Sequence, residues 1–116
     1  MLYKIKSIKH SGTCGERGTE RTDGRYPLRI DRIVELNIDD IEIGYPLMIR
    51  YVRDSDDTPM KFSFLKTSYV TSVNSVGKIS RNSLFVVVET ENSIFEFERV
   101  ADLYTDYAEV KTEKYE

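Results

Sequence analysis

Apolar and polar residues alternate along much of this chain, as they do in strands that bury one face. The alternation predicts four strands, at 2–8, 26–36, 47–52 and 60–73. The last is long or bent, with a bulge near 65–67, and Pro27 suits the first residue of an edge strand. The polar, glycine-containing stretch 10–25 is predicted to be a long loop, and 41–44 to be a short strand or the start of a turn.

The most regular pattern near the C-terminal end predicts a hairpin with a two-residue turn, Glu91-Asn92. This turn sets three cross-strand pairs: Thr90 with Ser93, Val88 with Phe95, and Val86 with Phe97. Both large apolar pairs then fall on one face, as cross-strand packing requires. Asn92, at the second central position, tolerates the positive φ that such a turn demands.

After Arg99 the apolar spacing changes to that of a short amphipathic helix, through Val100, Leu103, Tyr104 and Tyr107. We expect one β domain over 1–110 and a frayed tail over 111–116. The predicted fold is mainly β: a small curled antiparallel sheet or partly open barrel of about six strands with a short C-terminal helix. Eight Tyr and five Phe exceed what so small a core buries, which favours an aromatic-rimmed pocket or a subunit interface.

Composition limits the classes of function. The chain has 116 residues and a net charge of −3, which argues against coating a nucleic-acid polymer. Residues 1–36 hold eight cations and five acids, 37–88 six of each, and 89–116 three cations and nine acids. No apolar run is long enough to span a membrane, lysines stand where a signal peptide needs apolar residues, and a single Cys fits a reducing compartment. These features predict a cytoplasmic protein.

The sequence offers little support for a catalytic site or a metal site. His10 is the only histidine and, like Cys14, lies at a glycine-containing loop with nothing obvious to orient its ring, so we expect no catalytic residues. One Cys and one His do not close a zinc site. The run Asp54–Asp57 lacks the glycine and later glutamate of a calcium loop, and the neighbouring Asp39 and Asp40 point to opposite faces of a strand. We therefore predict no metal and no cofactor.

Arginines provide the strongest binding signal. The glycines of the 10–25 loop match neither a Rossmann turn nor a P-loop, yet glycine lets a backbone approach a phosphate closely and arginine binds it with two parallel hydrogen bonds. The candidates are Arg17, Arg21, Arg25 and Arg29, with Arg50, Arg53 and the segment Arg81-Asn82-Ser83 beyond. Aromatic residues available to stack on a base are Tyr26, Tyr51, Tyr69 and Phe85. The alternative is a mobile, solvated loop without a ligand.

Three segments carry a family resemblance: YKIKSIKHSG with the later YPLRIDRIVEL, then LMIRYV with FLKTSYVTSV, and finally VVVETENSIFEFE. In order, length and closing hairpin, roughly residues 1–98 resemble the first family of Thoeris anti-defence proteins of bacteriophages. That resemblance implies a non-enzymatic homo-oligomer that sequesters cyclic ADP-ribose-type signals in pockets between chains. Some members also hold cyclic oligonucleotides at separate sites. It further implies an infected bacterial cell as the setting.

Carried onto this sequence, the resemblance implies that Asn92 and Phe85 contact the nucleotide while Arg21, Arg25, Arg29 and Arg50 take its phosphates. Arg21→Ala and Arg50→Ala are then expected to weaken binding without unfolding the protein. Asn92 also has a purely structural interpretation, because its turn favours Asn, and the structural alternative for Phe85 is coverage of the second face of a curled sheet. The alternative function is a structural or protein-interaction module that docks a partner through a sheet edge and the acidic C-terminal helix.

Overall fold

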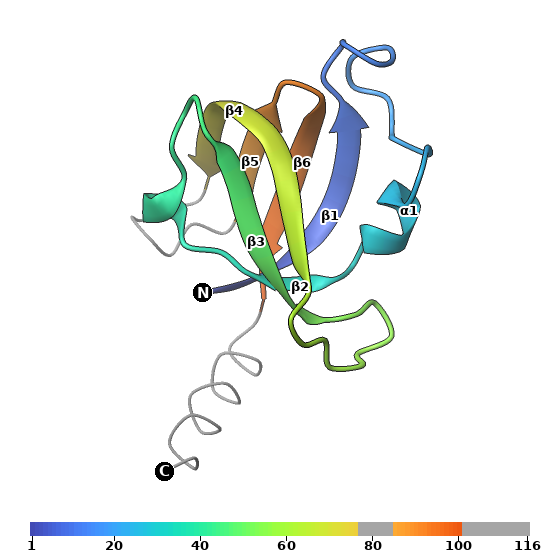
Figure 1. Ribbon diagram of the computed structural model, residues 1–116, viewed down its shortest axis with the longest axis vertical. Coiled ribbons are helices and arrows are strands. Elements are labelled where there is room, and N and C mark those ends of the chain that lie inside the picture. The colour runs from blue at the N-terminus through green and yellow to red at the C-terminus, as the bar shows by residue number, and fades with distance from the viewer. Residues whose placement is uncertain (77–84, 101–116) are drawn as a thin grey trace.

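Six antiparallel strands close into a barrel in the computed structural model, which describes residues 1–76 and 85–100 (Figure 1). The strands are β1 (Leu2–His10), β2 (Ile33–Glu35), β3 (Pro46–Arg53), β4 (Phe64–Val76), β5 (Phe85–Thr90) and β6 (Ser93–Arg99). Each strand pairs with the next along the chain, and β6 returns to pair with β1. The mainly β class and the six strands are confirmed, and the sheet is a closed barrel.

The longest strand, β4, bends where the register changes. Pro46 of β3 pairs with Tyr69, and Met48 pairs with Lys66, so two steps along β3 span three along β4. This extra residue confirms a bulge close to the position expected from the sequence, and bulges increase the local bend of a strand. Buried Thr67 lies within it and accepts a hydrogen bond from the Leu47 N–H at 2.9 Å.

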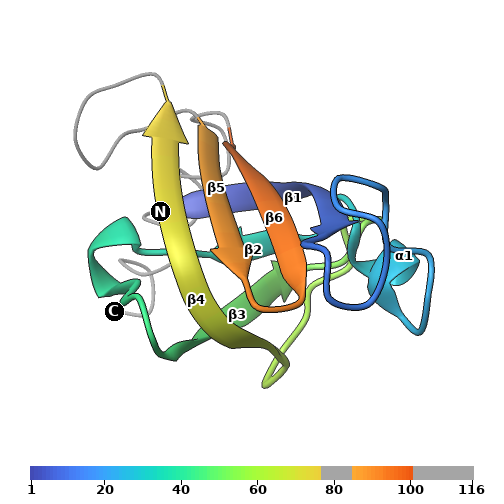
Figure 2. The ribbon, with the colours of Figure 1, turned by 90° about the horizontal axis from the view of Figure 1, so that it is seen from above.

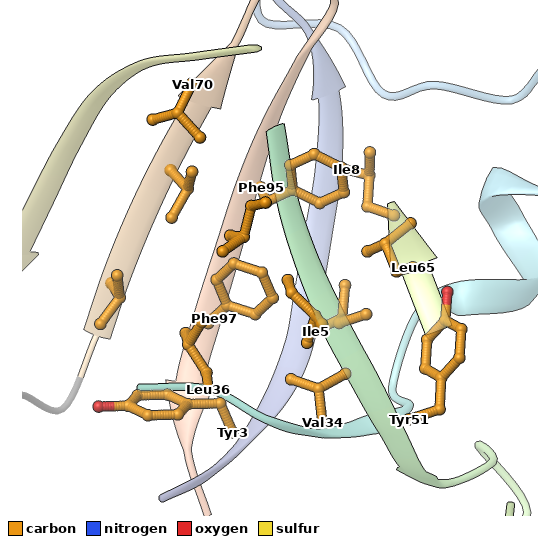
Figure 3. Close-up of a cluster of buried hydrophobic side chains, with 14 residues drawn as sticks. Tyr3, Ile5, Ile8, Val34, Leu36, Tyr51, Leu65, Val70, Phe95 and Phe97 are labelled. Carbon is orange, nitrogen blue, oxygen red and sulfur yellow. The ribbon is translucent and has the colours of Figure 1, made fainter. Parts of the chain in front are cut away.

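Large apolar side chains from all six strands fill the barrel (Figure 3). The predicted hairpin pairs are confirmed, with Val86 opposite Phe97 and Val88 opposite Phe95, and all four side chains are buried. The rings of Phe95 and Phe97 are stacked, with centroids 6.0 Å apart. Regular alternation along β5 and β6 therefore identified the inward face correctly.

The segment 26–36 is not one strand, as its pattern predicted. Tyr26–Arg29 forms the one-turn helix α1, and β2 begins only at Ile33. Pro27 lies in the first turn of α1, where a missing N–H leaves no hydrogen bond unmade. Asp31 then takes a φ of 72° and redirects the chain into β2. Proline and a left-handed residue thus interrupt a stretch whose apolar spacing also suits a strand.

Helical segments on opposite sides of the barrel extend its core (Figures 1 and 2). Around α1, Tyr26 and Ile30 pack against the core residues. On the other side is the short 3-10 helix η1 (Ile38–Asp40), where Ile38 and Ile41 do the same. The expected short strand or turn at 41–44 is a turn, in which Gly44 takes a φ of 95°.

Thr90 rather than a left-handed asparagine closes the two-residue turn at 91–92. Asn92 does not adopt a positive φ, so that expectation was wrong. Instead, the Ser93 N–H donates to Thr90 Oγ1 at 3.1 Å, and the Glu91 N–H donates to the Tyr69 carbonyl at 3.0 Å. The turn is therefore held by the Thr90 side chain and by a hydrogen bond to β4, and not by the positive φ that the sequence predicted for Asn92.

Several expectations lie outside the described residues: the helix beyond Val100, the frayed tail 111–116, the domain limit at 110 and the segment 81–83. Across 1–76 and 85–100, no helix is long and apolar enough to cross a bilayer.

Candidate functional site

The long loop between β1 and α1 is fastened to the β5–β6 turn. Arg17 forms a two-pronged ion pair with Glu89, in which Nη2 donates to Oε1 at 2.8 Å. Thr13 donates to Asn92 Oδ1 at 2.7 Å, and the Ser11 N–H donates to the Asn92 carbonyl at 3.4 Å. The Asn92 side chain is therefore engaged in holding the loop in this structure.

Arg21 is the buried centre of this attachment, with only 8% of its surface exposed. Its Nη1 donates to Ser93 Oγ at 2.8 Å and to the Asn92 carbonyl at 3.2 Å, and its other nitrogens bind the Asp23 carboxylate. The hydrogen bond from Arg21 also lowers the pKa of Asp23. Because most of its donors are used inside the protein, Arg21 has little capacity left for a phosphate.

The Arg17–Glu89 pair gives a testable pH dependence. The hydrogen bond from Arg17 holds the pKa of Glu89 below its ordinary value of 4.5. The pair therefore contributes fully above that value and is lost as the pH falls through the lower folded-state pKa. We expect Arg17→Ala to raise the pKa of Glu89 toward 4.5, measured by carboxyl-carbon NMR titration. Arg25→Ala is the matched control, and an equal shift in both variants would contradict the assignment.

Two arginines and a tyrosine form the cluster that we consider the candidate site, here called the α1 cluster: Arg25, Tyr26 and Arg29. The guanidinium carbon of Arg29 lies over the Tyr26 ring, 4.7 Å from its centroid, and that of Arg21 lies over the same ring at 4.1 Å. Within the described parts of the chain, neither Arg25 nor Arg29 has an ion pair. Their charges are therefore available to an anion that approaches α1.

The remaining predicted site residues lie apart from this cluster. Arg50 is on the outer surface of β3, where Nη2 faces Glu35 Oε1 at 3.7 Å. Phe85 begins β5 and is 43% exposed, whereas Asn92 follows the other end of that strand, roughly 20 Å away at the usual rise per residue. The structure thus brings Arg21, Arg25, Arg29 and the Asn92 backbone to one region and leaves Arg50 and Phe85 elsewhere.

Two of the expected stacking aromatics have other environments. Tyr51 is buried, and the guanidinium of Arg32 lies 4.7 Å from its ring centroid. Tyr69 is exposed on β4, and its carbonyl accepts the Glu91 N–H of the β5–β6 turn. Tyr26 is therefore the candidate aromatic that adjoins the arginines.

His10 and Cys14 occupy different environments. Nδ1 of His10 is buried without a hydrogen-bond partner. The His10 ring packs on Gly15, where an added Cβ would come within 2.8 Å of it, so the close approach requires glycine. Cys14 is exposed. In the described ranges, no three His, Cys, Asp or Glu side chains gather as metal ligands.

A cavity of about 250 Å³ opens beside η1, on the side of the barrel away from α1. Its lining includes the acidic residues Glu35 and Asp39 together with Met1, whose amino group pairs with Glu35 at 2.8 Å. Carboxylates repel phosphates, so this cavity does not suit the anionic ligand predicted from the arginines.

Exposed apolar residues on β3 and β4 form a second candidate surface, which the sequence analysis did not locate. Three cross-strand pairs point outward and define what we call the β3–β4 face: Arg50 with Phe64, Met48 with Lys66, and Pro46 with Tyr69. Next to it lies Phe62, which is 93% exposed and holds a φ of 56° that aromatic residues rarely adopt. The number of Tyr and Phe residues indicated that some of them are exposed, but it did not show on which strands the exposed ones lie.

Comparison of the sequence with protein-family models and with curated proteins, and of the structure with solved structures, finds no match.

Proposed function

We propose that the protein acts by binding rather than by catalysis, and that the α1 cluster takes the phosphates of a small nucleotide. The observation that carries this proposal is the contrast among the arginines. Arg17, Arg21, Arg32 and Arg50 each face a carboxylate, whereas Arg25 and Arg29 have no such partner among the described residues. Two uncompensated guanidinium groups supply charge-assisted hydrogen bonds to the phosphates of a nucleotide.

The ligand that the family resemblance suggests is a cyclic ADP-ribose-type signal, held without turnover in the cytoplasm of an infected cell. Its pyrophosphate would bind Arg25 and Arg29, and its adenine would stack beside them. Sequestration requires tight binding and slow release, and it requires no catalytic group or cofactor.

A second copy of the chain would complete the pocket. We place α1 at the interface, where walls from another molecule would enclose the nucleotide. Leu28, on the same one-turn helix, is 61% exposed and offers an apolar contact for that second copy. This arrangement agrees with the homo-oligomer and the pockets between chains that the resemblance implies.

We expect cyclic ADP-ribose to raise the melting temperature of the protein. A ligand present at about 100 times its Kd stabilises a protein by about 2.7 kcal/mol, which corresponds to several degrees. Arg29→Ala should weaken the binding measured by calorimetry about tenfold or more, because it removes a charge-assisted hydrogen bond. Ligand released by heating should be chemically unchanged.

Arg50→Ala is the matched control, since Arg50 lies on β3 and pairs with Glu35. If Arg50→Ala abolishes binding and Arg29→Ala does not, the site belongs on β3. Adenosine, which lacks phosphate, should produce no shift. Light scattering of the same sample should show an oligomer that Leu28→Asp dissociates, and a monomer that binds nucleotide equally well would contradict the shared pocket.

A second candidate function is protein docking, and the β3–β4 face favours it. Because the strands close into a barrel, we propose a face rather than the expected sheet edge as the docking element. Its four outward apolar residues and two cations match an acidic segment with apolar side chains on one side. A small barrel serves such a role as an interaction module without any catalytic residue.

A further inference from the structure

The charge and exposure of the β3–β4 face define what can cover it. Met48 and Phe64 are more than half exposed, and they sit next to the cations Lys66 and Arg50. Arg50 already faces Glu35 of β2 at 3.7 Å, whereas Lys66 forms no ion pair within the described ranges. An occupant that complements this face must carry both apolar groups and carboxylates.

The chain contains a segment of that chemistry directly after the barrel. Residues 101–116 hold five acids and two lysines, a net charge of −3. Their apolar residues include Leu103, Tyr104, Tyr107 and Val110, which repeat at three- and four-residue intervals. The segment thus combines acidic and apolar residues, as the face requires.

The barrel places the start of this segment within reach of the face. Val100 N–H donates to the Leu2 carbonyl at 3.0 Å. From there one row of cross-strand partners runs around the wall, from Leu2 to Glu35, to Arg50 and to Phe64. Four strand spacings amount to about 19 Å. Residues 101–107 alone span about 23 Å when extended, so the apolar part of the segment is long enough to reach the face.

We propose that residues 101–116 cover the β3–β4 face of their own chain and compete there with an external partner. The apolar side chains of the segment contact Met48 and Phe64, and its carboxylates pair with Lys66. The competition with a partner rests on the docking function proposed above, whereas the coverage itself does not depend on the nucleotide site at α1. The acidic end of the chain is then a regulator of its own docking face.

Carbodiimide cross-linking of the full chain tests the contact. This reagent joins a lysine amine to a carboxylate that it touches. A mixture of ¹⁴N- and ¹⁵N-labelled protein should give links from Lys66 to acids of 101–116. In every linked pair, both peptides should carry the same nitrogen isotope, because the link forms within one chain. Lys9→Arg should leave them, and Lys66→Arg should remove them. The ion pairs of Lys6 with Glu98 and of Lys9 with Glu96, at 3.5 and 3.6 Å, are internal positive controls.

Links from Lys66 that join unlike isotopes would assign the face to a second copy and overturn the proposal. The absence of Lys66 links while the control links form would do the same.

A dye that fluoresces on apolar surfaces, anilinonaphthalene sulfonate, provides an independent measurement. The double variant Leu103→Asp/Tyr107→Asp should expose the face and increase the fluorescence several-fold. The matched control, Thr105→Asp/Thr112→Asp, adds the same charge and should leave it unchanged. Adding Met48→Asp to the first variant should abolish the increase.

The dye also separates the two proposals. If the unmodified protein binds as much dye as the double variant, and Met48→Asp abolishes that binding, then the face is open. That result would contradict coverage by residues 101–116 but would leave the proposed docking function in place. If Met48→Asp changes dye binding in neither protein, the docking function itself is contradicted.

Discussion

Replacing Phe97 with alanine is expected to remove a large part of the stability of the barrel. The Phe97 side chain is fully buried, stacks with Phe95 and lies opposite Val86 (Figure 3). Truncation of such a ring costs the transfer free energy of the lost atoms plus that of the cavity left behind, about 3–5 kcal/mol. Domains of this size are stable by about 5–15 kcal/mol. Urea unfolding should show the loss, with a melting temperature lower by more than about 10 °C.

Phe64→Ala is the matched control for this prediction. It makes the same chemical change on β4, but the Phe64 side chain points outward and is 54% exposed. We expect its free energy of unfolding to change by less than about 1 kcal/mol. Equal losses in the two variants would mean that the inward and outward faces have been assigned incorrectly.

Replacing Arg21 with alanine is expected to destabilise the protein by about 3 kcal/mol. The change leaves Ser93 Oγ without a donor, removes one of the two donors to the Asn92 carbonyl, and removes the ion partner of Asp23. The sequence alone predicted weaker ligand binding without unfolding for this variant. Chemical denaturation measures the loss, and hydrogen exchange should be faster at the His10 amide, which donates to the Thr19 carbonyl of the attached loop.

Arg25→Ala provides the comparison, because Arg25 is exposed on the neighbouring segment. Its unfolding free energy should match that of the parent protein, while its affinity for a phosphorylated ligand falls. A stable Arg21→Ala variant that has lost nucleotide binding would instead support a direct ligand role for Arg21. The two arginines thus separate a structural contribution from a binding one.

Alternation was informative where strands are long and bury one face. Along β5 and β6 the alternation gave both the register and the inward residues, because one face of each strand contacts the core and the other contacts solvent. It failed over 26–36, where Leu28 and Ile30 have the spacing of a strand but belong to α1 and the turn after it. A four-residue helix is too short for its period to be distinguished from alternation.

Which residues form the candidate sites depends on distances between side chains in the folded protein, and spacing along the sequence does not give those distances. Arg21, Arg25 and Arg29 look equivalent as a series of arginines four residues apart, yet Arg21 is buried and the other two have no ion pair in the described structure. Likewise, Phe64 and Met48 are separated by many residues along the chain and become neighbours only when β3 pairs with β4. Function at a surface depends on which residues gather there, and that follows from tertiary pairing.

The sequence by itself determined the mainly β class, the strand-rich single core and the hairpin register, because local alternation and turn length fix which side chains share a face. It also identified arginine as the residue type most suited to an anionic ligand. Only the tertiary structure decided that the sheet closes, that Arg21 supports the loop while Arg25 and Arg29 remain available, and that an apolar and basic face forms across β3 and β4. The physical reason is that burial and ion pairing depend on contacts between segments distant in sequence.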